Sequence, residues 1–200
     1  MKQTSYVLIG LLSLAACRKD DGPNGPKPNP TPVPPPAMLY TDLQNREVKQ
    51  KQSQFIDLDK DGSTDIGFST LYIGDPIERE DEVLFFAGSF IHSHLFVGEA
   101  NDSPIFKKGD TIPVSPTKAY EWYQVAQVEM ARKNIGEQGP PYWELGWRQV
   151  SHKFLAIQIV REAKRYNGWI EVSFDIPGEK LILHRAAICK EPEKNVPAGI

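Results

Sequence analysis

Short apolar or alternating runs recur along the chain from residue 38 onwards, and glycine, proline, aspartate or charged residues bound each of them. Such runs predict β-strands. In the run WIEVSF at 169–174, Ile170, Val172 and Phe174 alternate with a more polar set, which is typical of a strand with one apolar and one mixed face. The clearest predicted strands are 83–87, 90–97, 154–160, 169–174 and 181–188, and weaker ones are 39–48, 54–58 and 66–73.

About eight strands joined by turn-rich connections predict an all-β domain, either a two-sheet antiparallel sandwich or a jelly roll. One segment departs from this pattern. Apolar residues recur at helical spacing between residues 119 and 133, which predicts one short helix there. A chain of 200 residues is long enough to bury a core without disulfide or metal support.

The N-terminus has the pattern of a secretory signal peptide. Lys2 precedes a nine-residue apolar run at 6–14, which is shorter than the roughly 20 residues that span a bilayer. The run ends in Leu-Ala-Ala-Cys, which resembles the lipobox of bacterial lipoproteins. The resemblance implies that residues 1–16 are removed and that Cys17 carries the lipid, including palmitate-type acyl chains, that anchors the protein to a membrane.

Residues 18–37 hold eight of the 17 prolines and no apolar residue larger than valine. Such a segment cannot form a core, and we expect an extended tether. The chain therefore divides into a signal peptide (1–16), a lipidated cysteine with a proline-rich linker (17–37) and a folded domain (38–200). The RKDD run at 18–21 is similar to the signal that sends lipoproteins of Bacteroidetes-type bacteria to the outer surface of the outer membrane. An ordinary solvated charge run is the alternative.

The net charge argues against one class of ligand, and the cysteine content argues against a disulfide. The formal net charge of −3 argues against a nucleic-acid-binding protein, which usually carries a basic excess. Because Cys17 is assigned to lipid, Cys189 has no partner for a disulfide. Cys189 ends the apolar run 186–189, so we expect an inert buried thiol.

One motif carries specific chemistry, the DxDxDGxxD loop within FIDLDKDGSTD at 55–65. Acidic side chains at alternate positions can converge on one hard cation, and a glycine permits the sharp turn. Calcium suits the set because it accepts six to eight oxygen ligands. The predicted ligands are Asp57, Asp59, Asp61, the carbonyl of Ser63, and Asp65.

The loop departs from a complete EF-hand. Phe68 stands where an EF-hand has its bidentate glutamate, and both flanks are predicted strands rather than helices. We therefore expect a structural strand–loop–strand calcium site with a weak Kd of about 10⁻⁴ to 10⁻³ M. The alternative is an acidic, solvent-facing turn that binds no metal.

The loop and the end of the chain together resemble a family of uncharacterised secreted bacterial β-domains, many of them anchored at the cell surface. The segments that carry the resemblance are 55–68, FLAIQ at 154–158, RYNGWIEV at 165–172 and PAGI at 197–200. Asn167 interrupts the Tyr-Gly-Trp run of that family. The family has no settled activity, so the resemblance implies architecture and calcium binding and no catalytic residues.

Two histidines form an H-x-H pair at His92 and His94. Such a pair can chelate zinc if a third ligand, His152 or His184, approaches it. A partly buried pair with ordinary hydrogen bonds is the alternative. The G-x-S-x-G, H-E-x-x-H and phosphate-loop motifs do not occur, and no spacing singles out an acid–base pair.

Trp and Tyr residues are concentrated between residues 120 and 147. Ring faces with polar tips can bind sugars or partner proteins. The candidate ligand-binding residues are Trp122, Tyr142, Trp143 and Trp147. Packing of these rings in the core is the alternative.

The sequence thus indicates a calcium-stabilised binding module at the cell envelope, and its expected ligand is an extracellular glycan or an envelope protein. A secreted hydrolase of polysaccharide or lipid is the first alternative, and a structural accessory subunit of an envelope complex is the second. A binding role is favoured over an enzyme because no catalytic motif is present.

Overall fold

The computed structural model describes residues 34–77 and 79–200. The predicted signal peptide, Cys17 and most of the predicted linker lie outside the described residues. The compact unit extends from Pro34 to Ile200, and its first strand begins at Met38. Within the described residues, no helix is long and apolar enough to span a membrane.

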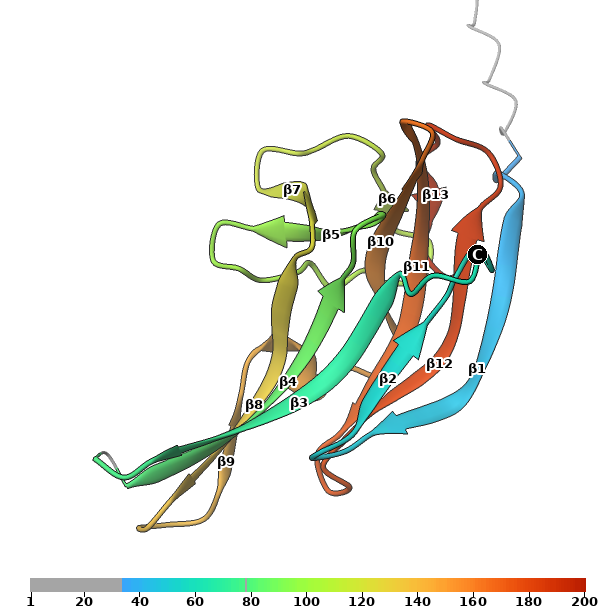
Figure 1. Cartoon of the computed structure of the whole chain (residues 1–200). Coiled ribbons are helices and arrows are strands. Elements are labelled where there is room, and N and C mark those ends of the chain that lie inside the picture. Colours follow the sequence, from blue (N-terminus) through green and yellow to red (C-terminus); the bar gives the residue numbers. More distant parts are fainter. Residues whose placement is uncertain (1–33, 78) are drawn as a thin grey trace, which may run out of the picture. The chain divides into compact units, whose positions relative to one another are not determined.

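Two antiparallel sheets form the domain (Figure 1). The six-stranded sheet has the order β1 (Met38–Val48), β12 (Lys180–Cys189), β11 (Lys164–Asp175), β10 (Lys153–Arg161), β5 (Ser93–Gly98) and β7 (Tyr120–Gln124). The five-stranded sheet has the order β2 (Ser53–Ile56), β3 (Ile66–Asp75), β4 (Glu80–Ser89), β8 (Gln127–Gly136) and β9 (Tyr142–Glu144). The remaining elements are a small sheet of β6 (Thr111–Ile112) with β13 (Val196–Pro197), and a 3₁₀ helix, Gly146–Gln149.

The main core lies between the two large sheets. Phe68 and Phe85 come from the five-stranded sheet, and Leu155, Ile170 and Val172 come from the six-stranded sheet. These side chains meet because successive residues of a strand point to opposite faces. The structure is therefore all-β with two packed antiparallel sheets, which confirms the predicted sandwich.

The opposite face of the six-stranded sheet carries a second, smaller core. Trp169 is fully buried there with Phe154, and the β6–β13 pair contributes Ile112 and Val196. Cys189 is buried in the same cluster, as predicted, and burial raises the pKa of its thiol. The mixed face of the strand at 169–174 is thus covered at one end and open at the other.

The helix expected at 119–133 is wrong, because this segment forms β7 and the first part of β8. The strands pair Phe85 with Ala131 and Phe86 with Glu129, so Met130 is an extra residue in β8. This β-bulge turns two consecutive residues, Met130 and Ala131, into the core. A bulge interrupts strict alternation, and the resulting apolar spacing imitates that of a helix.

Candidate functional site

The acidic loop connects β2 to β3 within an antiparallel hairpin, in which Ile56 pairs with Ile66. The strand–loop–strand setting predicted for the motif is therefore confirmed. Leu58 is buried in the main core, whereas its neighbours Asp57 and Asp59 belong to the acidic cluster. The loop is thus anchored by one apolar side chain in the middle of its acidic residues.

Hydrogen bonds within the loop hold it in a tight turn. The carboxylate of Asp57 accepts the backbone N–H groups of Lys60 (2.7 Å) and Gly62 (2.9 Å), and that of Asp61 accepts the N–H of Ser63 (2.7 Å). Gly62 has φ of 93°, a conformation that favours glycine. The turn therefore forms from local hydrogen bonds and one glycine, as the motif predicts.

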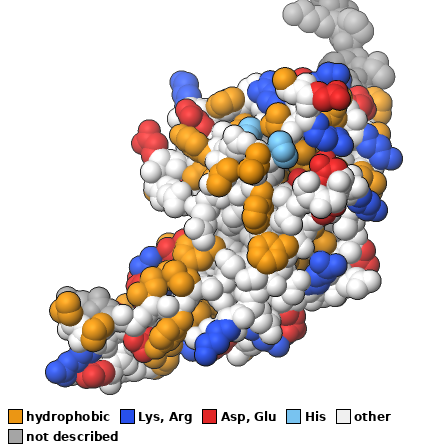
Figure 2. Space-filling model, viewed as in Figure 1, with side chains coloured by type: hydrophobic (Ala, Val, Ile, Leu, Met, Phe, Trp, Pro, Cys, Tyr) orange, Lys and Arg blue, Asp and Glu red, His pale blue; other side chains and the backbone are white. Residues whose placement is uncertain are grey.

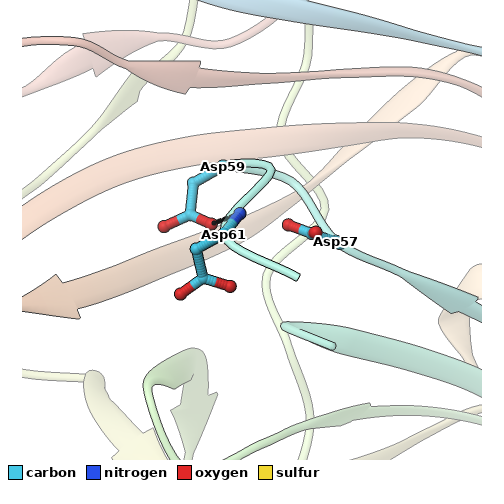
Figure 3. Close-up of side chains that lie close together, drawn as sticks. All are labelled: Asp57, Asp59 and Asp61. Carbon is cyan, nitrogen blue, oxygen red and sulfur yellow. Dashed lines mark hydrogen bonds between the residues drawn. The ribbon is translucent and has the colours of Figure 1, made fainter. Parts of the chain in front are cut away.

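Three carboxylates meet at this turn (Figure 3). One oxygen each of Asp57, Asp59 and Asp61 lies within 4.8 Å of the other two. The Asp59 side chain is only 2 % exposed, and its buried Oδ2 has no hydrogen-bond partner. This same Oδ2 makes a salt-bridge contact with Nη1 of Arg161, at 3.4 Å. Burial, with Asp61 and Asp57 nearby, raises the pKa of Asp59.

Asp65 has a different place in the loop. Its buried carboxylate accepts the backbone N–H of Leu58 at 2.7 Å, and its carbonyl accepts the Ser93 hydroxyl. Burial raises the pKa of Asp65 to about 6, and the neighbouring Asp59, Asp57 and Asp61 add to the shift. Asp65 therefore closes the base of the loop and does not join the three-carboxylate cluster.

The cluster has the chemistry of a site for a hard cation. Three carboxylates offer oxygen ligands, and the buried Oδ2 of Asp59 contacts Arg161 but accepts no hydrogen bond, so it has lone pairs left for a cation. The donor set therefore fits Ca²⁺. Phe68, at the position of the EF-hand glutamate, is buried in the core and offers no ligand. Ser63 lies in the turn, where its N–H bonds to Asp61.

The aromatic residues at 120–147 do not form one exposed surface. Trp147 is buried and donates its Nε1–H to the carbonyl of Ser103. Trp143 packs on Phe85 and Phe174, with ring centroids 5.9 and 5.1 Å away. Trp147 belongs to the main core and Trp143 packs against it, so both rings serve core packing rather than ligand binding.

Trp122 and Tyr142 lie apart from these two rings, on β7 and β9 respectively. Trp122 is half-buried against Phe96, at 4.7 Å, and donates its Nε1–H to the carbonyl of Pro113. Tyr142 is exposed on β9, and its hydroxyl bonds to Glu80. The candidate residues therefore do not form a single exposed platform, and core packing, the other interpretation of this segment, holds for part of them.

The histidines do not form the zinc site that the H-x-H spacing would permit. His92 lies in an exposed turn, whereas His94 is on β5 and bonds to Gln158. His152 and His184 stack on each other, with centroids 4.3 Å apart. Among residues 34–77 and 79–200, the acidic trio is the one group of three His, Cys, Asp or Glu side chains whose ligand atoms meet.

A polar cavity of about 430 Å³ lies on the outer face of the six-stranded sheet, which sequence reasoning missed. Its lining residues come from β1, the turn before β10, β11 and β12: Tyr40, Thr41, Asp42, Asn45, His152, Glu171, His184 and Arg185. The one sequence signal was the polar set of residues on the mixed face of the strand at 169–174. Nothing in the sequence indicates that the other strands bring polar residues to the same place.

Glu171 is the buried anion at the centre of this cavity. Its carboxylate accepts hydrogen bonds from Nε of Arg185 (2.5 Å) and from Nδ1 of His152 (2.7 Å). Burial by itself raises the pKa of Glu171, but the hydrogen bonds from Arg185 and His152 outweigh it, so the pKa is lowered. The charge of Glu171 is thus balanced by its own neighbours.

His184 lies between two polar partners. Its Nε2 is 2.8 Å from the hydroxyl of Ser173, and its Nδ1 is 2.6 Å from Oδ1 of Asn45. The Ser173 hydroxyl oxygen also accepts the backbone N–H of His152 at 2.9 Å. Burial, and next the charge of His152, lowers the pKa of His184. A neutral His184 satisfies the geometry, since Nδ1–H donates to Asn45 and Nε2 accepts the Ser173 proton.

Hydrophobic side chains gather on the face of the molecule shown in Figure 2, over β3 and β4 and towards β5. A groove of about 280 Å³ on the five-stranded sheet is lined in part by Phe55, Phe90 and Val125, all of them exposed. Phe55 and Phe90 make an edge-to-face contact at 6.2 Å. This groove is the second concave surface of possible functional interest.

No protein-family model, no curated protein and no solved structure matches this chain. The resemblance of the acidic loop and the late strand to secreted bacterial β-domains therefore stays a prediction.

Proposed function

We propose that this protein is a lipoprotein of the outer membrane or cell surface, anchored through Cys17. In this proposal, Ca²⁺ bound by Asp57, Asp59 and Asp61 stabilises the β-sandwich, which binds an extracellular glycan or another envelope protein. The observation that carries the calcium assignment is that one oxygen each of Asp57, Asp59 and Asp61 lies within 4.8 Å of the other two, beside a buried Asp59 Oδ2 that contacts Arg161 but has no hydrogen bond.

Calcium has a structural role in this proposal. Carboxylates that are close together repel one another, and a divalent cation replaces that repulsion with attraction. Asp59 also pairs with Arg161, which ends β10 of the opposite sheet. A bound cation therefore fixes the β2–β3 hairpin at a point where the two sheets come together.

Thermal unfolding with calcium and with a chelator tests this role. We expect millimolar Ca²⁺ to raise the Tm, because a ligand at about 1 to 10 times its Kd stabilises the folded state by about 0.4–1.4 kcal/mol. Asp59→Asn removes the charge of the buried oxygen and should abolish the increase. Asp42→Asn, an exposed aspartate on β1, is the matched control and should keep it. An unchanged wild-type Tm contradicts the calcium assignment.

The lipid anchor is tested separately in cells. Labelled palmitate should be incorporated into the wild-type chain, and the protein should fractionate with the outer membrane. Cys17→Ala should lose the label and leave the membrane fraction, whereas Cys189→Ala should retain both, because Cys189 is buried in the domain. A wild-type chain without label contradicts the proposed anchor.

The proposed binding role is supported by two concave surfaces, the polar cavity on one sheet and the apolar groove on the other. Ligand sites are usually concave and combine apolar area with a few directed polar groups. Screening the calcium-loaded protein against a glycan array and against detergent-solubilised envelope proteins tests this role. Retention of no glycan and no protein contradicts it.

A hydrolase is the second candidate, because Ser173, His184 and Asn45 form a hydrogen-bonded chain. Nucleophile, base and orienting group are arranged in this order in serine hydrolases. Ser173, however, is not among the residues that line the cavity. Hydrolysis of p-nitrophenyl acetate that is lost in Ser173→Ala supports a hydrolase, and equal background rates for both proteins exclude this serine as a nucleophile.

A further inference from the structure

Irregular backbone occurs at several positions that border the polar cavity. The pairing of β1 with β12 shifts between Asp42 and Arg46, and the pairing of β11 with β12 shifts at Glu171. Two lining residues, Asn45 (φ 54°) and His152 (φ 49°), have left-handed backbone. Bulges redirect side chains, and strained backbone is common at functional sites. The cavity is therefore formed by departures from regular sheet geometry.

Several polar side chains of the cavity are held in place by hydrogen bonds and still have donor or acceptor atoms without a partner in the described part of the chain. Glu171 fixes Arg185 through Nε and His152 through Nδ1. Within the described part of the chain, the two terminal nitrogens of Arg185, Nε2 of His152 and the hydroxyl of Tyr40 have no hydrogen-bond partner. These groups are oriented by the protein and remain available to a ligand.

An aromatic side chain borders the same cavity. Tyr40 is 51 % exposed, and it makes an edge-to-face contact with the buried Trp169 at 6.2 Å. The guanidinium of Arg185 lies 5.2 Å from the centroid of the same indole ring. Tyr40 and Arg185 are therefore supported by one rigid residue, and such preorganisation lowers the entropic cost of binding.

The charges of the cavity decide which class of ligand it suits. Arg185 is balanced by Glu171, and Asp42 adds a further negative charge, so the cavity has no positive excess for an anion. Hydrogen-bond donors and acceptors are instead mixed beside an apolar ring. A neutral polyhydroxylated ligand meets both conditions, since its hydroxyl groups donate and accept and its C–H face packs on an aromatic ring.

We propose that this cavity binds a neutral saccharide unit, with Tyr40 packing on the sugar ring and with Arg185, His152 and Asp42 bonding to its hydroxyl groups. The proposal rests on the proposed binding function and names its ligand class and its location. The site differs from the tryptophan-rich segment that the sequence suggested. The cavity volume of about 430 Å³ is within the range of small-ligand sites.

Isothermal titration calorimetry of the calcium-loaded full chain tests the proposal. The probes are neutral cello-, xylo-, manno- and malto-oligosaccharides, with an oligogalacturonate as the anionic comparison. At least one neutral probe should bind with a micromolar to millimolar Kd. Tyr40→Ala should weaken that binding by about tenfold or more, which corresponds to the loss of one central aromatic contact.

Tyr123→Ala is the matched control, because Tyr123 is a tyrosine on β7 with a similar exposure of 50 %. Its Kd should stay within about twofold of wild type. Tyr40→Phe keeps the ring and should recover most of the affinity lost in Tyr40→Ala. Near-UV circular dichroism of each variant checks that the fold is intact.

Three results would overturn the proposal: no neutral probe binds at millimolar concentration, the anionic probe binds more tightly, or Tyr40→Ala and Tyr123→Ala bind equally well. The last result moves the ligand to another surface and leaves the proposed binding function standing. A calcium-dependent increase in Tm without binding of any saccharide leaves the calcium assignment standing and removes the saccharide.

Discussion

The acidic loop and the polar cavity are both clusters of charged residues, but they satisfy their charges in different ways. Asp57, Asp59 and Asp61 are three like charges, of which Asp59 pairs with Arg161. In the cavity, Glu171 is bonded to two cationic or ionisable groups of its own. The loop therefore concentrates negative charge, which is the basis of the proposed calcium site, whereas the charge of Glu171 is balanced within the cavity, which is the basis of the proposed neutral ligand.

The pKa shifts of Asp59 and Glu171 show the same difference between the acidic loop and the cavity. Burial raises the pKa of Asp59, whereas hydrogen bonds outweigh burial and lower the pKa of Glu171. A raised carboxyl pKa shows that the folded protein penalises the charge, and a lowered one shows that it stabilises the charge. A cluster that penalises its own charges is the one where an external cation contributes most.

The largest effect should come from the residue that supports the cavity. Trp169 is fully buried and contacts Tyr40, Phe154 and Arg185. Trp169→Ala should lower the free energy of unfolding by about 3–5 kcal/mol, because it leaves a large void. Urea denaturation measures the loss, and calcium affinity should remain unchanged. Reduced calcium affinity in this variant would show that the two regions are coupled.

The corresponding residue beneath the acidic loop is Leu58, which is buried in the main core between Asp57 and Asp59. Leu58→Ala should destabilise the protein by about 2–4 kcal/mol and should also weaken calcium binding, because the loop loses its anchor. Urea denaturation and calcium titration measure the two effects. A variant that is destabilised but binds calcium normally would show that the loop holds its geometry without Leu58.

The acidic loop was predictable because Asp57 to Asp65 are contiguous and local hydrogen bonds form the turn. The strands at 83–87 and 154–160 were predictable for a similar reason, since alternation and boundaries are local signals. The cavity was not, because β1, β11 and β12 bring its residues together only through sheet pairing. The bulge at Met130 shows the same limit, since it is defined only by the pairing of β8 with β4.

A pH titration should distinguish the two regions further. The folded pKa of His184 lies below its ordinary value of 6.5, so its neutral form contributes stability above pH 6.5 that is lost as the pH falls through the folded pKa. His184→Gln should reduce this loss, by at most about 1.4 kcal/mol per pH unit. Urea denaturation at several pH values, with a chelator present, measures the slope.

His92→Gln is the control for this titration, because His92 lies in an exposed turn. Its stability should follow the wild-type slope. The groups that face His184 are His152, Glu171 and Arg185, and all three are retained in both variants. Parallel curves for wild type and His184→Gln would contradict the assignment of the slope to this residue.

The smallest predicted effect concerns Arg161, the cation that pairs with Asp59 of the acidic loop. Arg161 stabilises Asp59 in the metal-free protein and repels an incoming cation. Arg161→Gln should therefore tighten calcium binding by about two- to fivefold, a change typical of a partly exposed charge pair. Arg79→Gln, whose partner is Glu137, is the control and should leave the affinity unchanged. Weaker binding in Arg161→Gln would contradict this electrostatic account.

The central claim is that the three-carboxylate loop binds calcium, and calorimetric titration of Ca²⁺ into the metal-free chain tests it most directly. We predict one site with a Kd of about 10⁻⁴ to 10⁻³ M, which is absent in Asp59→Asn and retained in Asp42→Asn. No binding heat and no increase in Tm at millimolar calcium, or equal binding by wild type and Asp59→Asn, would contradict the claim.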